Sequence, residues 1–280
     1  MIRELRLDAN GLSFRALAAG PESGPPMLLL HGFPEGAEEW ADQLEALDSA
    51  GVRAVAPDLR GYGGTDAPAG VERYTLAALV EDVAALAASM GGGPVHLAGH
   101  DWGALTGWSA VTARPQLFRT WTAISIPHLA DLAAAIATDD DQKARSSYVQ
   151  LFMVAGKAES VLSEDGFRRL AAMYGGKLPA ARVERYLEGL RRPGRLTAAL
   201  NYYRANLQGG SGGSDGPVRV PTVMVWGDHD LAAGRVAVEA TERRVQAPYR
   251  LVVLEGAGHW LPAERAAEVS EVLVQQATSG

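Results

Sequence analysis

The chain opens with alternating polar and apolar positions over residues 3–19, interrupted at Asn10-Gly11. Asn-Gly between two alternating runs is a strong signal for a two-residue hairpin turn, so this region predicts a pair of antiparallel strands. Beyond it, short apolar runs rich in leucine and β-branched residues predict six more strands, at residues 27–31, 53–58, 94–99, 120–126, 222–226 and 249–254. Because these runs are apolar on both faces, they are typical of a parallel sheet covered by helices on both sides.

Longer segments with helical periodicity separate the strands, at residues 38–49, 76–90, 102–113 and 263–277. The interval 128–216 differs, because it predicts only helices, at residues 140–154, 163–173, 180–190 and 195–207. It closes in a polar Gly- and Ser-rich stretch, 209–217, whose composition is typical of a flexible connection. We therefore predict an α/β core domain of residues 1–127 and 217–280, with a helical cap domain, 128–216, inserted into it.

Composition narrows the classes of partner. The 280 residues include 26 Lys and Arg against 33 Asp and Glu, a net charge of −7, without the basic cluster that nucleic-acid binding requires. There is no cysteine, which excludes disulfides and thiolate chemistry. The first residues, MIRELRLDANG, are too charged for a signal peptide, and no apolar run approaches the roughly 18 residues that span a bilayer. We expect a cytoplasmic protein that binds neither nucleic acid nor membrane.

The segment Gly99-His100-Asp101-Trp102-Gly103 lies between a predicted strand and a predicted helix. Strand, G-x-nucleophile-x-G and helix together form the context of a nucleophile elbow. Here an aspartate, Asp101, occupies the position where a serine is usual. Taken alone, an aspartate before a helix is more often only an N-terminal cap. Three further motifs favour the interpretation of Asp101 as a nucleophile.

The first two motifs follow the last two predicted strands. His259 stands in a Gly-rich loop, EGAGHW, where this arrangement delivers a catalytic base. The preceding strand ends in WGDHD, whose carboxylates Asp228 and Asp230 are both candidates to orient that histidine. Nucleophile, acid and histidine then follow the chain order of α/β-hydrolases. The third motif, HGFPE at 31–35, places the Phe33 amide in an oxyanion hole, with the Trp102 amide as second donor.

These residues resemble those of the α/β-hydrolase superfamily, and within it the epoxide hydrolase and haloalkane dehalogenase branch, over nearly the whole chain. In that branch the acid lies three residues beyond the glycine of W-G-x-x-D, which selects Asp230. The loop DLRGYGGTD, 58–66, is similar to the family's D-x-R-G-x-G-x-S, with threonine at position 65. The resemblance implies a mostly parallel twisted sheet flanked by helices, with an inserted helical cap.

Epoxide hydrolases carry two cap tyrosines that hold the epoxide oxygen. The segment LNYYR, 200–204, resembles the family's N-x-Y-R and implies this role for Tyr203. SYVQLF, 147–152, is similar to the segment around the other tyrosine and implies the role for Tyr148. We expect the remaining cap tyrosines, Tyr174, Tyr186 and Tyr202, to be packing residues.

A carboxylate nucleophile suits attack on a saturated carbon. Attack on an ester would give a high-energy anhydride, whereas attack on tetrahedral carbon gives an ordinary alkyl ester. An aspartate, with an ordinary pKa near ~3.9, needs no base for this step. We therefore expect Asp101 to open an epoxide with help from the two tyrosines, and a water activated by His259 to release a vicinal diol. No metal or organic cofactor has a role.

The substrate is expected to be a small apolar epoxide, bound by Phe33, Trp102, Phe152 and His128. Pairing of the cap helices into a homodimer is compatible with the sequence. The leading alternative is a haloalkane dehalogenase, but Phe33 stands where an asparagine usually binds the halide, and the interval 128–216 holds no tryptophan. Another α/β-hydrolase acting on a small apolar substrate remains open. A non-catalytic binding protein on the same fold is disfavoured, because it would have no need of the triad.

Overall fold

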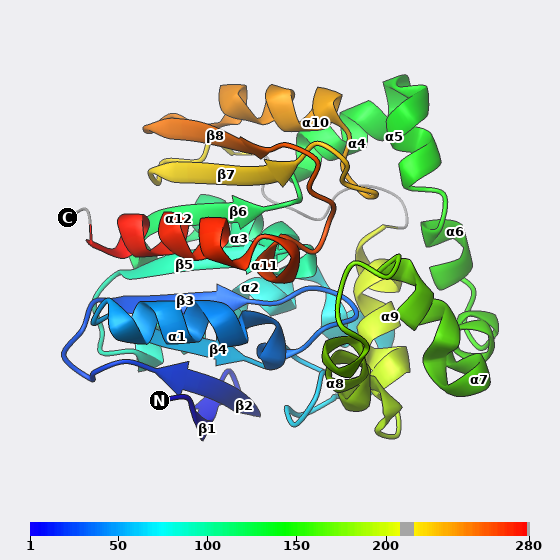
Figure 1. Ribbon diagram of the computed structural model, residues 1–280, viewed down its shortest axis with the longest axis horizontal. Coiled ribbons are helices and arrows are strands. Elements are labelled where there is room, and N and C mark those ends of the chain that lie inside the picture. The colour runs from blue at the N-terminus through cyan, green and yellow to red at the C-terminus, as the bar shows by residue number, and fades with distance from the viewer. Residues whose placement is uncertain (208–215, 279–280) are drawn as a thin grey trace.

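The computed structural model describes residues 1–207 and 216–278, and its centre is a mostly parallel sheet (Figure 1). The eight strands lie in the order β1-β2-β4-β3-β5-β6-β7-β8. Strand β2 pairs antiparallel with β1 and β4, and all the other pairs are parallel. The predicted α/β-hydrolase fold is confirmed. The strand bounds are β1 Arg3–Ala9, β2 Leu12–Ala19, β3 Pro26–Leu30, β4 Arg53–Pro57, β5 Val95–His100, β6 Phe118–Ile124, β7 Thr222–Gly227 and β8 Tyr249–Leu254.

The antiparallel start of the sheet is the hairpin expected at Asn10-Gly11. Ala9 pairs with Leu12 across the turn. Asn10 and Gly11 both have positive φ, at 47° and 72°. A two-residue hairpin turn that matches the twist of its strands needs positive φ at both central positions, and asparagine and glycine tolerate it best.

Two hydrophobic layers cover the sheet, one on each face. On β3, Met27 and Leu29 belong to the layer under α1 (Ala41–Ser49) and α12 (Ala266–Thr278), and both are fully buried. Leu28 and Leu30 point to the other face, under α2 (Leu76–Ser89) and α3 (Trp102–Ala113), and are buried as well. Successive strand residues face opposite sides, so a strand covered on both faces must be apolar throughout.

Along the sequence, helices α4 to α9 all come between β6 and β7. Figure 1 shows α5 to α9 gathered at one end of the sheet, whereas α4 packs along α10 (Arg235–Ala240). The boundaries 128 and 216 of a separate cap domain remain a prediction, and most of the expected connection, 209–215, lies outside the described residues. The bounds are α4 Leu129–Thr138, α5 Asp140–Arg145, α6 Val149–Phe152, α7 Lys157–Met173, α8 Ala180–Arg191 and α9 Arg195–Asn206.

The single helix predicted over 140–154 is wrong. The structure has two helices, α5 and α6, and the backbone between them closes i→i+3 turns, such as Val149 N to Ser146 O at 3.2 Å, in place of α-helical bonds. The Gln142 amide donates to the carbonyl of Ala232, at 2.7 Å, and accepts from the Gly234 amide, at 2.8 Å, so α5 is fastened to the loop after β7. The helix expected at 163–173 begins earlier, at Lys157, and is kinked at 164–167, where the backbone is non-helical.

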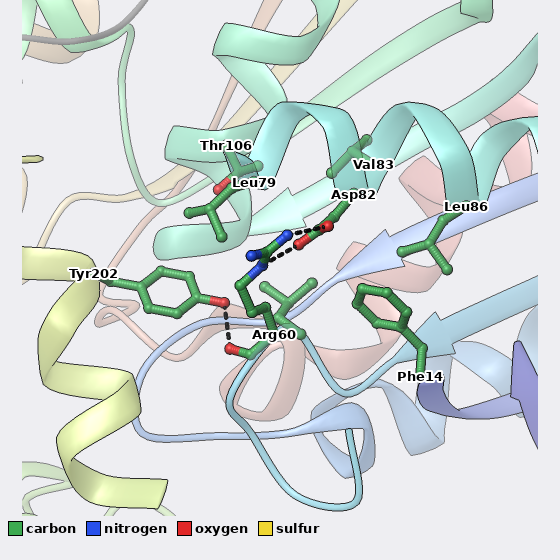
Figure 2. A pocket seen from close by; sticks show the side chains of 9 residues that line it. Phe14, Arg60, Leu79, Asp82, Val83, Leu86, Thr106 and Tyr202 are labelled. Carbon is green, nitrogen blue, oxygen red and sulfur yellow. Dashed lines mark hydrogen bonds and ion pairs between the residues drawn. The ribbon is translucent and has the colours of Figure 1, made fainter. Parts of the chain in front are cut away.

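A buried ion pair links the loop after β4 to α2, close to α9 (Figure 2). Arg60, in the loop after β4, donates to the Asp82 carboxylate on α2 through two nitrogens, at 2.6 and 2.7 Å. The Tyr202 hydroxyl on α9 donates to the backbone oxygen of Arg60 at 2.7 Å. Asn10 in the hairpin also donates to Asp82, at 2.8 Å. The β1–β2 hairpin, the loop after β4, α2 and α9 are therefore all hydrogen-bonded to the Arg60–Asp82 pair.

The elements that complete the fold are short. The helix α11 (Leu261–Glu264) precedes α12, and four 3-10 turns connect larger elements: η1 (Ala37–Trp40), η2 (Val71–Tyr74), η3 (Pro115–Leu117) and η4 (Thr241–Arg244). Within the described residues, no helix is both long and apolar enough to cross a membrane.

Candidate active site

Asp101 occupies a sharp turn between β5 and α3. Its φ and ψ of 49° and −115° are unusual for a residue with a side chain. Gly99 and Gly103 make the turn sterically feasible, because a Cβ on Gly99 would collide with the Gly103 backbone and one on Gly103 with the Leu30 backbone. The turn presents the Asp101 carboxylate at the end of the central strands, as a nucleophile elbow requires.

The Asp101 carboxylate is 6% exposed and is held from two sides. The Phe33 amide donates to Oδ1 at 2.7 Å. Burial acts to raise the pKa of this carboxyl, but His259 and the Phe33 amide outweigh it, so the pKa lies below its usual value. Asp101 is therefore an anion at neutral pH. Among the described residues, the Trp102 amide forms no hydrogen bond with this carboxylate, so its part in an oxyanion hole stays a prediction.

His259 lies between two carboxylates. Its Nδ1 is 3.0 Å from both oxygens of Asp230, and its Nε2 is 3.7 Å from Asp101 Oδ2. Asp230 is fully buried, and its Oδ1 also accepts the amides of Ala232 and Ala233, at 2.7 and 3.0 Å. Of the two carboxylates left open by the residue pattern, Asp230 is the one that contacts His259. Asp228 instead accepts the Gly256 amide, at 2.7 Å.

The charge on His259 follows from these neighbours. Burial acts to lower its pKa, but Asp230 and Asp101 together raise it well above the usual value. His259 is then an imidazolium at neutral pH. A group that is to act as a base must first lose this proton, and Asp101 is one of the two carboxylates that favour keeping it.

The two cap tyrosines singled out by the resemblance lie over the elbow. The Tyr203 ring, on α9, contacts Trp102 and Phe33, with ring centroids 4.9 and 5.7 Å apart. Tyr148, at the start of α6, lies with its ring centroid 6.5 Å from that of Tyr203. Burial, and then the negative charge of Asp101, raise the pKa of both tyrosines. Both phenols thus remain protonated at neutral pH.

Phe152 completes an aromatic cluster around these tyrosines. Its ring lies 4.9 Å from Tyr203, 5.2 Å from Tyr148 and 5.4 Å from Phe33, measured between centroids, and all three contacts are edge-on. Edge-on aromatic contacts of this kind contribute packing energy beyond simple burial. The cluster joins α6 and α9 to the loop that carries Phe33.

His128 has a different setting. Its Nδ1 accepts the Ala130 amide at 3.3 Å and caps α4, and its ring packs edge-on against Trp108, at 5.5 Å. No described contact brings it to Asp101 or His259, so its contact with substrate remains a prediction. Tyr174 and Tyr186 pack against each other in the cap, with centroids 6.2 Å apart.

Three buried groups that sequence reasoning did not single out lie beneath the elbow. Glu35, Glu39 and His100 each offer a ligand atom, and these atoms lie within 4.8 Å of one another, the one such group in the described ranges that could hold a metal ion. Each is already engaged, because His100 Nδ1 lies 2.6 Å from Glu39 and the Tyr174 hydroxyl donates to Glu35, also at 2.6 Å. Glu35 belongs to the HGFPE motif, whereas nothing in the residue pattern marks Glu39.

Comparison with known proteins identifies the family of the chain. The profile described as alpha/beta hydrolase fold matches residues 25–266. The chain belongs to the α/β-hydrolase family. Within it, this hydrolase is 34% identical over 279 residues to Epoxide hydrolase 3 of Xenopus tropicalis, covering 96% of the chain and 76% of that relative. It is 32% identical over 274 residues to AB hydrolase superfamily protein YfhM of Bacillus subtilis (strain 168), covering 96% of each.

Comparison with solved structures also finds epoxide hydrolases. An epoxide hydrolase from Vigna radiata matches the hydrolase with a TM-score of 0.83 and 32% identity, covering 98% of this chain and 97% of that one. The Bacillus megaterium epoxide hydrolase in complex with an inhibitor matches with a TM-score of 0.88 and 26% identity, covering 97% and 99%. The protein is thus an α/β-hydrolase of the epoxide hydrolase branch.

Proposed function

We propose that the protein hydrolyses epoxides to vicinal diols. The observation that carries the proposal is an anionic aspartate at the elbow, close enough to two protonated tyrosines for its charge to raise their pKa values. The aspartate supplies a nucleophile for a saturated carbon, and the phenols supply protons to the oxygen that leaves it. This pairing fits a three-membered ring, where the leaving oxygen stays attached to the substrate and becomes an alkoxide.

In the first step, an Asp101 oxygen forms a bond to one epoxide carbon and the C–O bond of the ring breaks. The oxygen takes a proton from Tyr148 or Tyr203, since an alkoxide is costly in a buried pocket. Acid assistance of this kind contributes about 10²–10⁴-fold to rate. The imidazolium of His259 restores the tyrosine proton, which leaves His259 neutral and the product attached to Asp101 as an ester.

In the second step, the neutral His259 acts as a base. Esterification removes the charge of Asp101, one of the two carboxylates that raise the pKa of His259. His259 can then take a proton from a water that attacks Cγ of the Asp101 ester. The Phe33 amide, already bonded to Oδ1, stabilises the oxyanion, and one such donor contributes about 10²–10³-fold. The tetrahedral intermediate expels the diol and restores the carboxylate and the imidazolium.

The test is a direct assay of the purified protein. A Bacillus megaterium epoxide hydrolase mutant has been solved with a naphthyloxy-propane-diol product, so an aryl glycidyl ether is a suitable probe beside a brominated alkane. We expect diol from the ether and no bromide from the alkane. Asp101→Asn is expected to abolish diol formation, while the matched control Asp228→Asn, outside the triad, keeps it. Bromide release as fast as diol formation, or an active Asp101→Asn variant, contradicts the proposal.

A further inference from the structure

A buried carboxylate lies beneath the elbow and contacts two of the segments that form the site. Glu39, in the 3-10 turn η1, is 2% exposed. Its Oε1 is 2.6 Å from Nδ1 of His100, the residue just before Asp101. Its Oε2 accepts the Gly32 amide at 3.2 Å, one residue before Phe33. The same side chain therefore touches the strand that carries the nucleophile and the loop that carries the oxyanion donor.

His100 extends this contact to the third segment. Its Nε2 lies 2.9 Å from the backbone oxygen of His259, which also accepts the Ser125 hydroxyl at 2.6 Å. A carboxylate and a carbonyl oxygen are both acceptors, so each ring nitrogen of His100 must carry a proton. His100 is then an imidazolium that forms an ion pair with the Glu39 carboxylate through Nδ1 and a charge-assisted hydrogen bond to the His259 carbonyl through Nε2.

The surrounding charges support this assignment. Burial acts to lower the pKa of His100, but Glu39 outweighs it and raises the pKa. Burial, and then repulsion from Glu39, raise the pKa of Glu35 to about 8, so Glu35 is the neutral member of the cluster. The other titratable groups facing the cluster include Asp101, Tyr62, Tyr174, Tyr186 and His259. One carboxylate thus balances one imidazolium in a site closed to solvent.

We propose that Glu39 is a positioning residue, which keeps His100 doubly protonated and so fixes the backbones of His259 and Gly32 relative to Asp101. The inference rests on the proposed epoxide hydrolysis. His259 as base and the Phe33 amide act directly on the ester, whereas the bonds that change during ring opening belong to Asp101, the epoxide and the tyrosines, and His259 only restores the tyrosine proton afterwards. Loss of the Glu39 charge therefore slows hydrolysis of the ester more than its formation.

The experiment compares Glu39→Gln with Glu38→Gln. Glu38 is the neighbouring residue of η1 and pairs with Arg15, at 2.8 Å, away from the elbow. Rates of ester formation and ester hydrolysis are measured in single turnovers with an aryl glycidyl ether. We expect Glu39→Gln to slow hydrolysis about tenfold, the difference between a charge-assisted and a neutral hydrogen bond, with less than about a threefold change in formation. Glu38→Gln is expected to leave both rates unchanged.

A second readout does not depend on catalysis. Nitrogen NMR of histidine-labelled protein at neutral pH is expected to show His100, assigned by its loss in His100→Asn, as an imidazolium in the wild type and as a neutral ring in Glu39→Gln. If Glu39→Gln does not fold, Glu39→Asp serves instead. It keeps the charge but is one methylene shorter, so we expect slower hydrolysis, unchanged formation and a His100 that stays charged.

Three results overturn the inference. Equal slowing of both steps would indicate a merely structural role, and no slowing would indicate none. A neutral His100 in the wild type would remove the charge pair. One equivalent of divalent metal in the purified protein, lost in Glu39→Gln, would make the cluster a metal site instead. A wild type that makes no diol refutes the proposed function itself, whatever the charge of His100.

Discussion

His259 Nε2 lies 3.7 Å from Asp101 Oδ2, while the opposite nitrogen of the same ring lies 3.0 Å from Asp230. The two carboxylates hold the imidazole in its charged form, and the imidazolium in turn keeps Asp101 ionised. Nucleophile and base are therefore coupled. In the proposed reaction, esterification of Asp101 removes one of the two carboxylates that raise the pKa of His259, which favours the neutral base in the second step.

Removal of the base is expected to stop the reaction at the ester. His259→Gln leaves Asp101 able to attack the epoxide but leaves no group to activate water. The variant is expected to form a stable adduct whose mass exceeds that of the protein by the mass of the epoxide, as intact-protein mass spectrometry would show. The control is the double variant Asp101→Asn/His259→Gln, which should form no adduct. A His259→Gln variant with normal turnover contradicts the two-step scheme.

The two cap tyrosines are expected to act on ring opening. Tyr203→Phe and Tyr148→Phe each remove one proton donor, so each is expected to slow ester formation by about 10–100-fold, and the double variant by more. Tyr202→Phe is the matched control, because the Tyr202 hydroxyl bonds only the Arg60 backbone. It is expected to lower the free energy of unfolding by about 1 kcal/mol with formation unchanged. A Tyr202→Phe variant as slow as Tyr203→Phe would refute the assignment.

The rate of ester formation is expected to be flat across a wide pH range. The pKa of Asp101 is lowered, so the nucleophile is anionic at every pH above its ordinary value. The pKa values of both tyrosines are raised, so the phenols keep their protons on the alkaline side. Single-turnover rates measured after pH jumps should be constant between about pH 5 and pH 9. A fall with an apparent pKa inside this range contradicts the assigned charges.

The Arg60–Asp82 pair is expected to stabilise the fold far more than its surface counterpart. Asp82→Asn leaves the Arg60 guanidinium buried without its counter-charge, at a cost of about 3–5 kcal/mol in the free energy of unfolding. Glu81 is the next residue of α2 and pairs with Arg114, where both side chains are about half exposed. Glu81→Gln should change the stability by about 0.5 kcal/mol or less. Equal losses of unfolding free energy in the two variants, measured by urea unfolding, would contradict the assignment of Arg60–Asp82 in Figure 2 as the stronger pair.

The position of the candidate site could be predicted because its residues follow strands. Parallel strands bring their carboxyl ends to the same edge of a sheet, so Asp101, Asp230 and His259 were bound to meet there. The choice between Asp228 and Asp230 needed the family resemblance, because both stand in the same loop. Only the structure shows that Asp228 accepts a hydrogen bond from the Gly256 amide, while Asp230 is buried and contacts His259.

Contacts between segments that are distant in the sequence could not be predicted from the residue pattern. Glu39 and His100 belong to different elements, and their pairing depends on the tertiary contact between η1 and the last residue of β5. The side-chain hydrogen bonds of Gln142, which fasten α5 to the loop after β7, are likewise contacts between segments far apart in the sequence. His128 caps α4, and its contact with substrate stays a prediction.

The covalent ester on Asp101 is tested most directly by one turnover in water labelled with heavy oxygen. With the enzyme in excess over the epoxide, the oxygen added to the substrate must come from the Asp101 carboxylate, and the water oxygen must replace it there. The diol should therefore emerge unlabelled, and the peptide that contains Asp101 should carry the label. A labelled diol released from a protein whose Asp101 is unlabelled would contradict the account.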